Sequence, residues 1–116
     1  MRDVNKWLEE ALRELQLPCS EEPMRESVCP EGYIAWKMVR EKLLYASGKP
    51  WQRQVTADVS LWLPGDADWQ DVYGRAQWLL MQEGAWSKVF QGGEWVPELE
   101  LRRVTLRVKL PQEELS

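Results

Sequence analysis

Hydrophobic and polar positions along the chain follow two different periods, and their order predicts the fold. From residue 4 onwards, apolar residues recur every three or four positions, as on one face of a helix. Asp3 is a candidate N-cap for this helix, and Pro18 ends the segment. The stripe must pack on another element, and it consists of Val4, Trp7, Leu8, Ala11, Leu12 and Leu15.

Residues 33–44 fit two patterns. Residues 34, 36 and 38 are apolar and alternate with others as in a strand, whereas Trp36, Val39 and Leu43 also fit one face of a helix. The residue types favour a helix. We nevertheless expect a strand here, because the following segment needs a partner in a sheet.

A turn is expected over residues 47–50, and residues 53–63 then alternate strictly, which predicts a strand. One side is polar except for Trp62. The side expected to face the core carries Val55, Ala57, Val59, Leu61 and Leu63.

A second helical pattern follows Pro64-Gly65. Asp68 and Asp71 imitate a capping box, and Gly84 stands where a left-handed C-cap is expected. The apolar stripe of this helix consists of Trp69, Val72, Tyr73, Ala76, Leu79 and Leu80.

Two further strands are expected over residues 85–91 and 98–110, joined through a turn at Gly92-Gly93. In the last strand Val104, Leu106, Val108 and Leu110 should face the core. Arg103, Thr105, Arg107 and Lys109 form a basic outer row, which we interpret as protection of a sheet edge against aggregation. Residues 17–32 are expected to form an exposed connection, and residues 111–116 a frayed tail.

These patterns predict an α+β fold with the order α-β-β-α-β-β. The sheet is expected to be small and rich in antiparallel pairs, with two helices packed on one face and with open edges. The length of 116 residues fits one domain over residues 1–116.

The charge distribution is uneven. The net charge is −4, but residues 1–32 carry −4 and residues 33–65 carry +3. The overall charge argues against direct nucleic-acid binding. No apolar run is long enough to span a membrane, and the N-terminus lacks the apolar core of a signal peptide, so secretion is not expected.

Candidate catalytic chemistry is sparse. The chain has no His and two Cys, so Cys19 and Cys29 lack the partners for a zinc site or a Cys–His pair. We expect inert thiols, no metal, no cofactor and no catalytic residue. Asp66, Asp68 and Asp71 are explained by the dipole of the second helix. Gly92-Gly93 lacks the remaining residues of a phosphate-binding loop.

Eight Trp residues are more informative, because Trp is enriched at interface hot spots. Trp7, Trp69 and Trp78 are core candidates, whereas the others named below lie near strand ends, turns or polar faces. Partial burial under loops remains the alternative for these. The predicted contact residues are Lys49, Trp51, Arg53, Trp62, Trp86 and Trp95.

The chain resembles the tail-completion proteins of long-tailed bacteriophages, also called tail terminators or head–tail joining proteins. The likeness covers about residues 3–110 in element order. Members often carry a His near the start of the last strand, and this chain departs from that pattern. The residues that carry the likeness are Pro30, Tyr33-Ile34, Tyr45-Ala46, the strand Val55–Trp62, Gly84, Trp95, Glu98 and Arg102-Arg103-Val104.

The resemblance implies a non-enzymatic virion protein of a phage or prophage. Its subunits would close a ring, with a hexamer as one option, that caps the tail tube and receives the head connector or stopper protein. The protein would act in the bacterial cytoplasm during assembly and then in the virion at the head–tail junction. The alternatives are a small bacterial adaptor or immunity-type module and, less favoured, a small enzyme that uses carboxylates or a Cys.

Overall fold

The computed structural model describes residues 4–21, 32–98, 100–110 and 113–114. In this part of the chain, two helices and a mixed sheet of six strands confirm the α+β class. The structure contains two strands that the predicted order did not include, β1 and β6. The elements are α1 (Val4–Ala11), a 3-10 turn (Arg13–Leu15), β1 (Cys19–Glu21), β2 (Tyr33–Ala46), β3 (Lys49–Pro64), α2 (Trp69–Gln82), β4 (Trp86–Val96), β5 (Leu101–Lys109) and β6 (Glu113–Glu114).

The strands follow the order β1-β2-β3-β5-β4 across the sheet, and β6 pairs with β3 away from this path. β1 runs parallel to β2, and the other pairs are antiparallel. The segment expected to be a loop over residues 17–32 thus contains a strand. This strand pairs with β2, where Cys19 lies opposite Ile34, and the carbonyl of Pro18 accepts a 2.7 Å hydrogen bond from the amide of Ile34. Residues 22–31, including Cys29, lie outside the described part.

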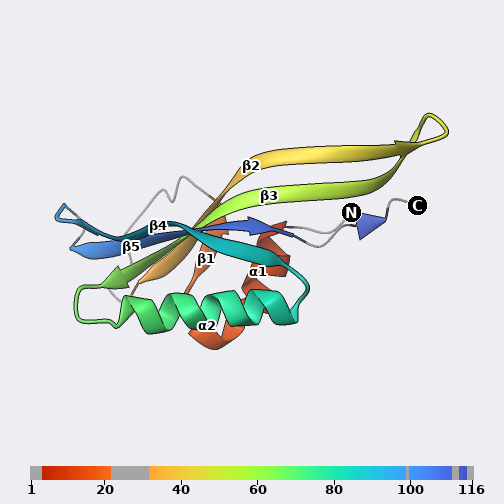
Figure 1. Ribbon diagram of the computed structural model, residues 1–116. Coiled ribbons are helices and arrows are strands. Elements are labelled where there is room, and N and C mark those ends of the chain that lie inside the picture. The colour runs from red at the N-terminus through yellow and green to blue at the C-terminus, as the bar shows by residue number, and fades with distance from the viewer. Residues whose placement is uncertain (1–3, 22–31, 99, 111–112, 115–116) are drawn as a thin grey trace.

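Both helices lie on the same side of the sheet (Figure 1). Buried residues of α1, α2 and one face of β2, β3 and β5 form a single hydrophobic cluster. The predicted stripe of α1 is buried in it, apart from the half-buried Leu15. Asn5 fixes α1 to the sheet, because its Oδ1 accepts a 2.7 Å hydrogen bond from Nε1 of Trp36. The proposed N-cap, Asp3, lies outside the described residues.

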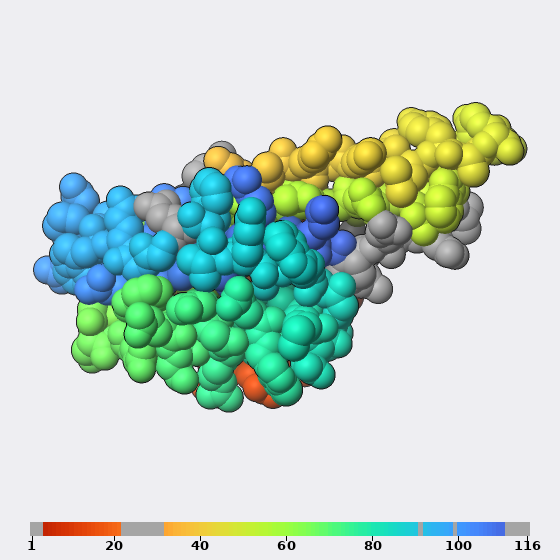
Figure 2. All heavy atoms as spheres, viewed as in Figure 1, coloured from red at the N-terminus to blue at the C-terminus, as the bar shows by residue number. Residues whose placement is uncertain are grey.

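Residues 33–44 form a strand as predicted, within a hairpin that is much longer than expected. β5 pairs with β3 from Thr56 onwards, and residues 39–54, here called the arm, project beyond the body (Figures 1 and 2). From Thr56 to the turn the arm spans roughly 25 Å, at about 3.3 Å per residue. The turn itself is tighter than predicted: Ser47 and Gly48 both have positive φ, 53° and 77°, as a two-residue type I′ turn requires.

Helix α2 begins and ends where the sequence predicts. The carboxylate of Asp68 accepts a 3.2 Å hydrogen bond from the amide of Asp71, and Gly84 adopts a left-handed φ of 85°. Ala76, Leu79 and Leu80 are buried. The prediction that Trp78 lies in the core is wrong, since this side chain is 54% exposed.

The predicted turn at Gly92-Gly93 is also wrong. β4 continues through these residues with register shifts against β5, because Gly93 lies against the Trp69 ring, where a Cβ atom would approach Cε2 to 2.7 Å. The chain reverses instead after Pro97, whose carbonyl accepts a hydrogen bond from the amide of Glu100.

This later turn changes the position of the basic row on β5. β5 lies between β3 and β4 in the sheet. The prediction that its basic row protects a sheet edge is therefore wrong. At the other end of β5 the chain reaches β6, which pairs with Gln52 and Arg53 of the arm. Residues 113–114 are therefore not frayed.

Candidate interaction surface

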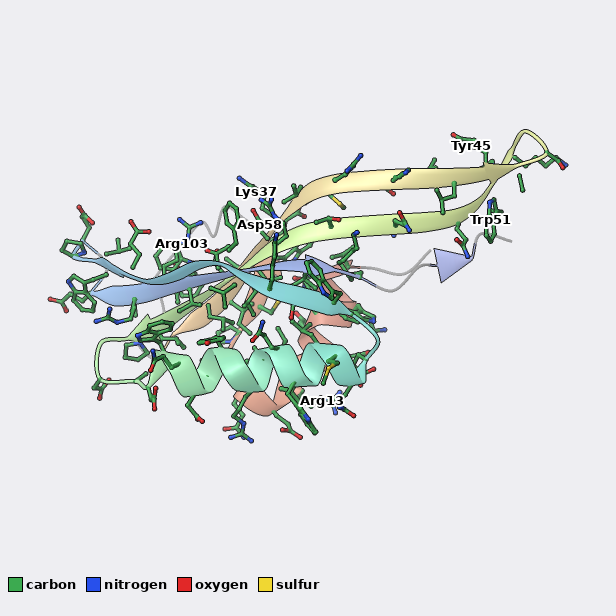
Figure 3. All side chains as sticks on the ribbon, in the orientation of Figure 1. Arg13, Lys37, Tyr45, Trp51, Asp58 and Arg103 are labelled. Atoms are coloured by element: carbon green, nitrogen blue, oxygen red, sulfur yellow. The ribbon has the colours of Figure 1, made fainter. Side chains whose placement is uncertain are left out.

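The end of the arm exposes aromatic and basic side chains together. Tyr45 is 62% exposed, Trp51 is also exposed, and both lie near the end of the arm in Figure 3. Lys49 is exposed beside the turn. Val39 and Leu43 add exposed apolar area along β2. The arm thus has the composition of a contact surface, with aromatic anchors and a positive charge.

Arg53, which was predicted to contact a partner, has a structural role in the arm. It is 8% exposed, and its Nε donates a hydrogen bond to the Glu41 carboxylate on the paired strand. This ion pair joins β3 to β2. It lies on the side of the arm that is continuous with the core-facing side of the sheet. Its guanidinium is therefore engaged within the chain.

The β4 edge of the sheet forms the second exposed apolar region. Trp86 is 56% exposed at the start of β4, and Phe90 and Trp95 are exposed further along it. On α2, Trp78 and Met81 are exposed nearby. A pocket of about 340 Å³ lies between the end of α2 and the start of β4, and it is lined by Gln77, Trp78, Met81, Ala85, Trp86 and Ser87.

Trp62 is more buried than its position on the polar side of β3 suggested. It is half-buried, stacks on the buried Tyr33 with ring centroids 5.6 Å apart, and lies 5.2 Å below the guanidinium of Arg103. Its Nε1 is buried without a hydrogen-bond partner. Trp62 therefore packs this face of the sheet and offers little surface to a partner.

The sheet face opposite the helices carries a row of charges across four strands. Lys37, Asp58, Arg107 and Lys88 lie in register on β2, β3, β5 and β4. Two guanidinium nitrogens of Arg107 donate to the two Asp58 oxygens at 2.9 and 3.2 Å, and this hydrogen bonding raises the pKa of Arg107. The same guanidinium lies 4.1 Å from the centre of the Phe90 ring. Figure 3 shows Lys37, Asp58 and Arg103 on this side of the sheet.

Cys19 has the environment of an unreactive thiol. Burial raises its pKa from 9.0 to about 12, with a smaller contribution from the Glu9 carboxylate. Its Sγ donates a weak hydrogen bond to Asn5 Oδ1 at 3.8 Å. At neutral pH the group stays protonated, and a protonated thiol is a poor nucleophile and metal ligand.

Across residues 4–21, 32–98, 100–110 and 113–114, no three His, Cys, Asp or Glu side chains gather as a metal site would require. Neither described helix has the length and apolarity to cross a bilayer. Asp68 caps α2, which agrees with the structural explanation of that carboxylate.

The six predicted contact residues therefore separate into two groups. Lys49 and Trp51 lie together on the arm, and Trp86 and Trp95 lie on β4, all exposed, whereas Arg53 and Trp62 are engaged within the chain. The prediction omitted the exposed residues Tyr45, Trp78 and Phe90. A signal existed for Trp78, because it lies four positions after Gly74 and four before Gln82, on the polar side of the helical pattern.

No protein-family model matches the chain, and a search of the curated proteins found no match either.

Proposed function

We propose that this protein is a non-enzymatic assembly protein of a phage or prophage virion. Copies form a ring at the head-proximal end of the tail and join the tail to the head connector. The arm is the observation that carries the proposal. A hairpin that extends roughly 25 Å from a small α+β body, with Tyr45, Trp51 and Lys49 exposed at its end, is suited to reaching a neighbouring protein.

The ring would close through heterologous contacts, in which one patch on a subunit meets a different patch on the next. The open edge of β4 supports this step, since Trp86 and Trp95 are exposed along it beside the α2–β4 pocket. Exposed aromatic residues on an edge strand favour association with another chain. A hexamer is the ring size that we propose.

The end of the arm would contact the tail tube or the connector. Lys49 supplies a positive charge there, and Trp51 supplies an apolar anchor. Arg53 contributes indirectly, because its ion pair with Glu41 ties the two strands of the arm together. The protein would assemble in the bacterial cytoplasm and remain at the head–tail junction of the virion.

Purified tail tubes provide the test. The wild-type protein should cap one end of the tube in electron micrographs. Trp51→Ser, on the arm, should reduce the fraction of capped ends while the mass of the free protein stays unchanged. Trp86→Ser, at a comparably exposed Trp on β4, should instead lower the mass of the oligomer. Bare tube ends at saturating wild-type protein would reject the proposal.

A small bacterial adaptor or immunity-type module is the second candidate, favoured by the α2–β4 pocket, which fits an apolar side chain of any protein partner. Neighbouring genes for capsid and tail proteins support the virion function. A neighbouring toxin gene, together with bare tube ends, would support the adaptor or immunity function.

A further inference from the structure

The side of the sheet that the helices leave uncovered is strongly basic. Within strands β2, β3, β5 and β4, pairing places seven basic residues and two acidic ones on this sheet face, a net charge of +5 in a chain whose net charge is −4. The basic residues are Lys37, Arg40, Lys42, Lys88, Arg103, Arg107 and Lys109, and the acidic ones are Asp58 and Glu94.

Six of these cations are concentrated in one patch. One row joins Lys37 and Lys88 through Arg107, the next joins Arg40 and Lys109 through Thr56, and Lys42 follows on the arm. Strands are about 4.8 Å apart and successive rows about 6.7 Å apart, so the backbone of the patch measures roughly 14 Å on a side.

This arrangement has an energetic cost within a single copy of the chain. Lys88 lies directly opposite Arg107, and like charges directly opposite each other on neighbouring strands are destabilising. Asp58 neutralises Arg107 in part. The surrounding cations keep the patch positive, which favours an acidic surface laid against it.

The other side of the two-layer fold has the opposite charge. Among the described residues, the exposed side chains of α1, α2 and the short segments that flank them include seven acidic and three basic ones, a net charge of −4. Figure 3 places Arg13 on this side, away from Lys37, Asp58 and Arg103. The acidic residues are Glu9, Glu10, Glu14, Asp66, Asp68, Asp71 and Glu83, and the basic ones are Lys6, Arg13 and Arg75.

We infer that the basic sheet face of one copy docks on the acidic helix layer of the next. This inference deepens the proposed ring and rests on it, because it adds two charged surfaces to the β4 edge in the contact between subunits. Each surface also carries exposed apolar area, Phe90 on the sheet face and Met81 on α2. Because the two surfaces are different patches of the same chain, the contact is heterologous and repeats from copy to copy, and it closes a ring when the rotations between successive copies add up to a full turn.

A second copy fits this face better than a nucleic acid does. A nucleic acid would also meet the acidic helix layer and the negative net charge, which oppose its approach. A second copy instead supplies an acidic surface of nearly equal and opposite charge. Such complementarity raises the association rate and selects the orientation of docking.

Sedimentation velocity at low and high salt tests the inference with two charge-reversal variants. The sheet variant is Lys88→Glu with Lys109→Glu, and the helix variant is Glu10→Lys with Asp66→Lys; all four side chains are exposed. Wild-type association should weaken as salt rises, because exposed charges are screened. Each variant alone should associate about tenfold more weakly or worse.

Mixing the two variants is the decisive measurement. The reversed sheet face of one variant then matches the reversed helix layer of the other, and the two unaltered faces also match. An equimolar mixture should therefore regain wild-type mass as alternating copies. Glu98→Lys, which reverses an exposed charge in the turn between β4 and β5 and away from both faces, should associate like the wild type.

Three results would overturn the inference. They are a wild-type protein that stays monomeric at about 1 mM in low salt, a mixture of variants that does not associate, and a labelled DNA duplex that binds the wild type but not the sheet variant. Capping of tail tubes separates this inference from the proposed function. Capped tubes with a mixture that fails to associate would reject the docking faces and leave the virion function in place.

Discussion

Arg107 on β5 and Asp58 on β3 lie directly opposite each other, and their side chains form two hydrogen bonds of 2.9 and 3.2 Å. The pair lies in the middle of a row that also holds Lys37 and Lys88. Asp58 is thus the acidic group within a row of cations, and its effect on stability should depend on the screening of those cations.

Asp58→Asn should lower the melting temperature more at low salt than at high salt. Its removal leaves three cations in one row, and their repulsion extends about 30 Å at 0.01 M salt but about 3 Å at 1 M. Thermal unfolding at the two salt concentrations measures the difference. Asp66→Asn, which removes an exposed carboxylate from the acidic helix layer, is the matched control and should not show this salt dependence.

Gly93→Ala should destabilise the fold by about 1–3 kcal/mol, the usual range for overpacking. A Cβ atom at this position would lie 2.7 Å from Cε2 of Trp69, and the backbone φ of 25° is unfavourable for an L residue. Urea unfolding gives the change in free energy. Wild-type stability in this variant would show that the indole moves aside freely.

Gly74→Ala should have the opposite effect. Gly74 lies on the exposed side of α2, and nothing lies within 4 Å of the position that a Cβ atom would take. Alanine is favoured over glycine inside helices by about 1 kcal/mol. The same urea titration should show stabilisation of this size, and a loss of stability would mean that another part of the chain contacts this side of the helix.

Ser47→Asn should stabilise the turn of the arm, by up to about 1 kcal/mol. Ser47 has a φ of 53°, a left-handed conformation that Asn adopts more readily, and Asn-Gly is the preferred pair of a type I′ turn. Hydrogen exchange of the arm amides should slow while exchange in β5 stays unchanged. Faster exchange in the arm would contradict the turn geometry.

Cys19 should resist alkylation in the folded protein up to about pH 9 and react rapidly after unfolding. Its pKa is raised from 9.0 to about 12 in the fold, so the folded state retains the proton that the unfolded state loses first. The stability linked to this group is complete below pH 9 and is lost as the pH rises towards 12. Thiol labelling followed by mass spectrometry, in a Cys29→Ser background, measures the rate.

Much of the local structure could be predicted because it depends on short-range chemistry. The stripes of α1 and α2, the Asp68 cap, the left-handed Gly84 and the alternating faces of β3 and β5 follow from spacing and residue type. Among the predicted contact residues, Trp86 and Trp95 are exposed on β4, although the turn at Gly92-Gly93 that placed Trp95 near a turn does not form.

Other features depend on contacts between distant residues. Gly92-Gly93 has the composition of a turn, but packing against Trp69 makes it part of β4. Arg53 was predicted to contact a partner from its residue type, but it forms an ion pair with Glu41 on the neighbouring strand.

The amino-acid sequence by itself determined where the helices lie and which side of β3 and β5 faces the core, because both follow from periodicity along the chain. The tertiary structure decided which strands are neighbours, since a period of two contains no information about the pairing partner. That choice places β5 inside the sheet and β4 at its edge, and it extends the β2–β3 hairpin into an arm. It also brings Lys37, Arg107 and Lys88 from three strands into one row, which creates the basic face that no single segment of the chain contains.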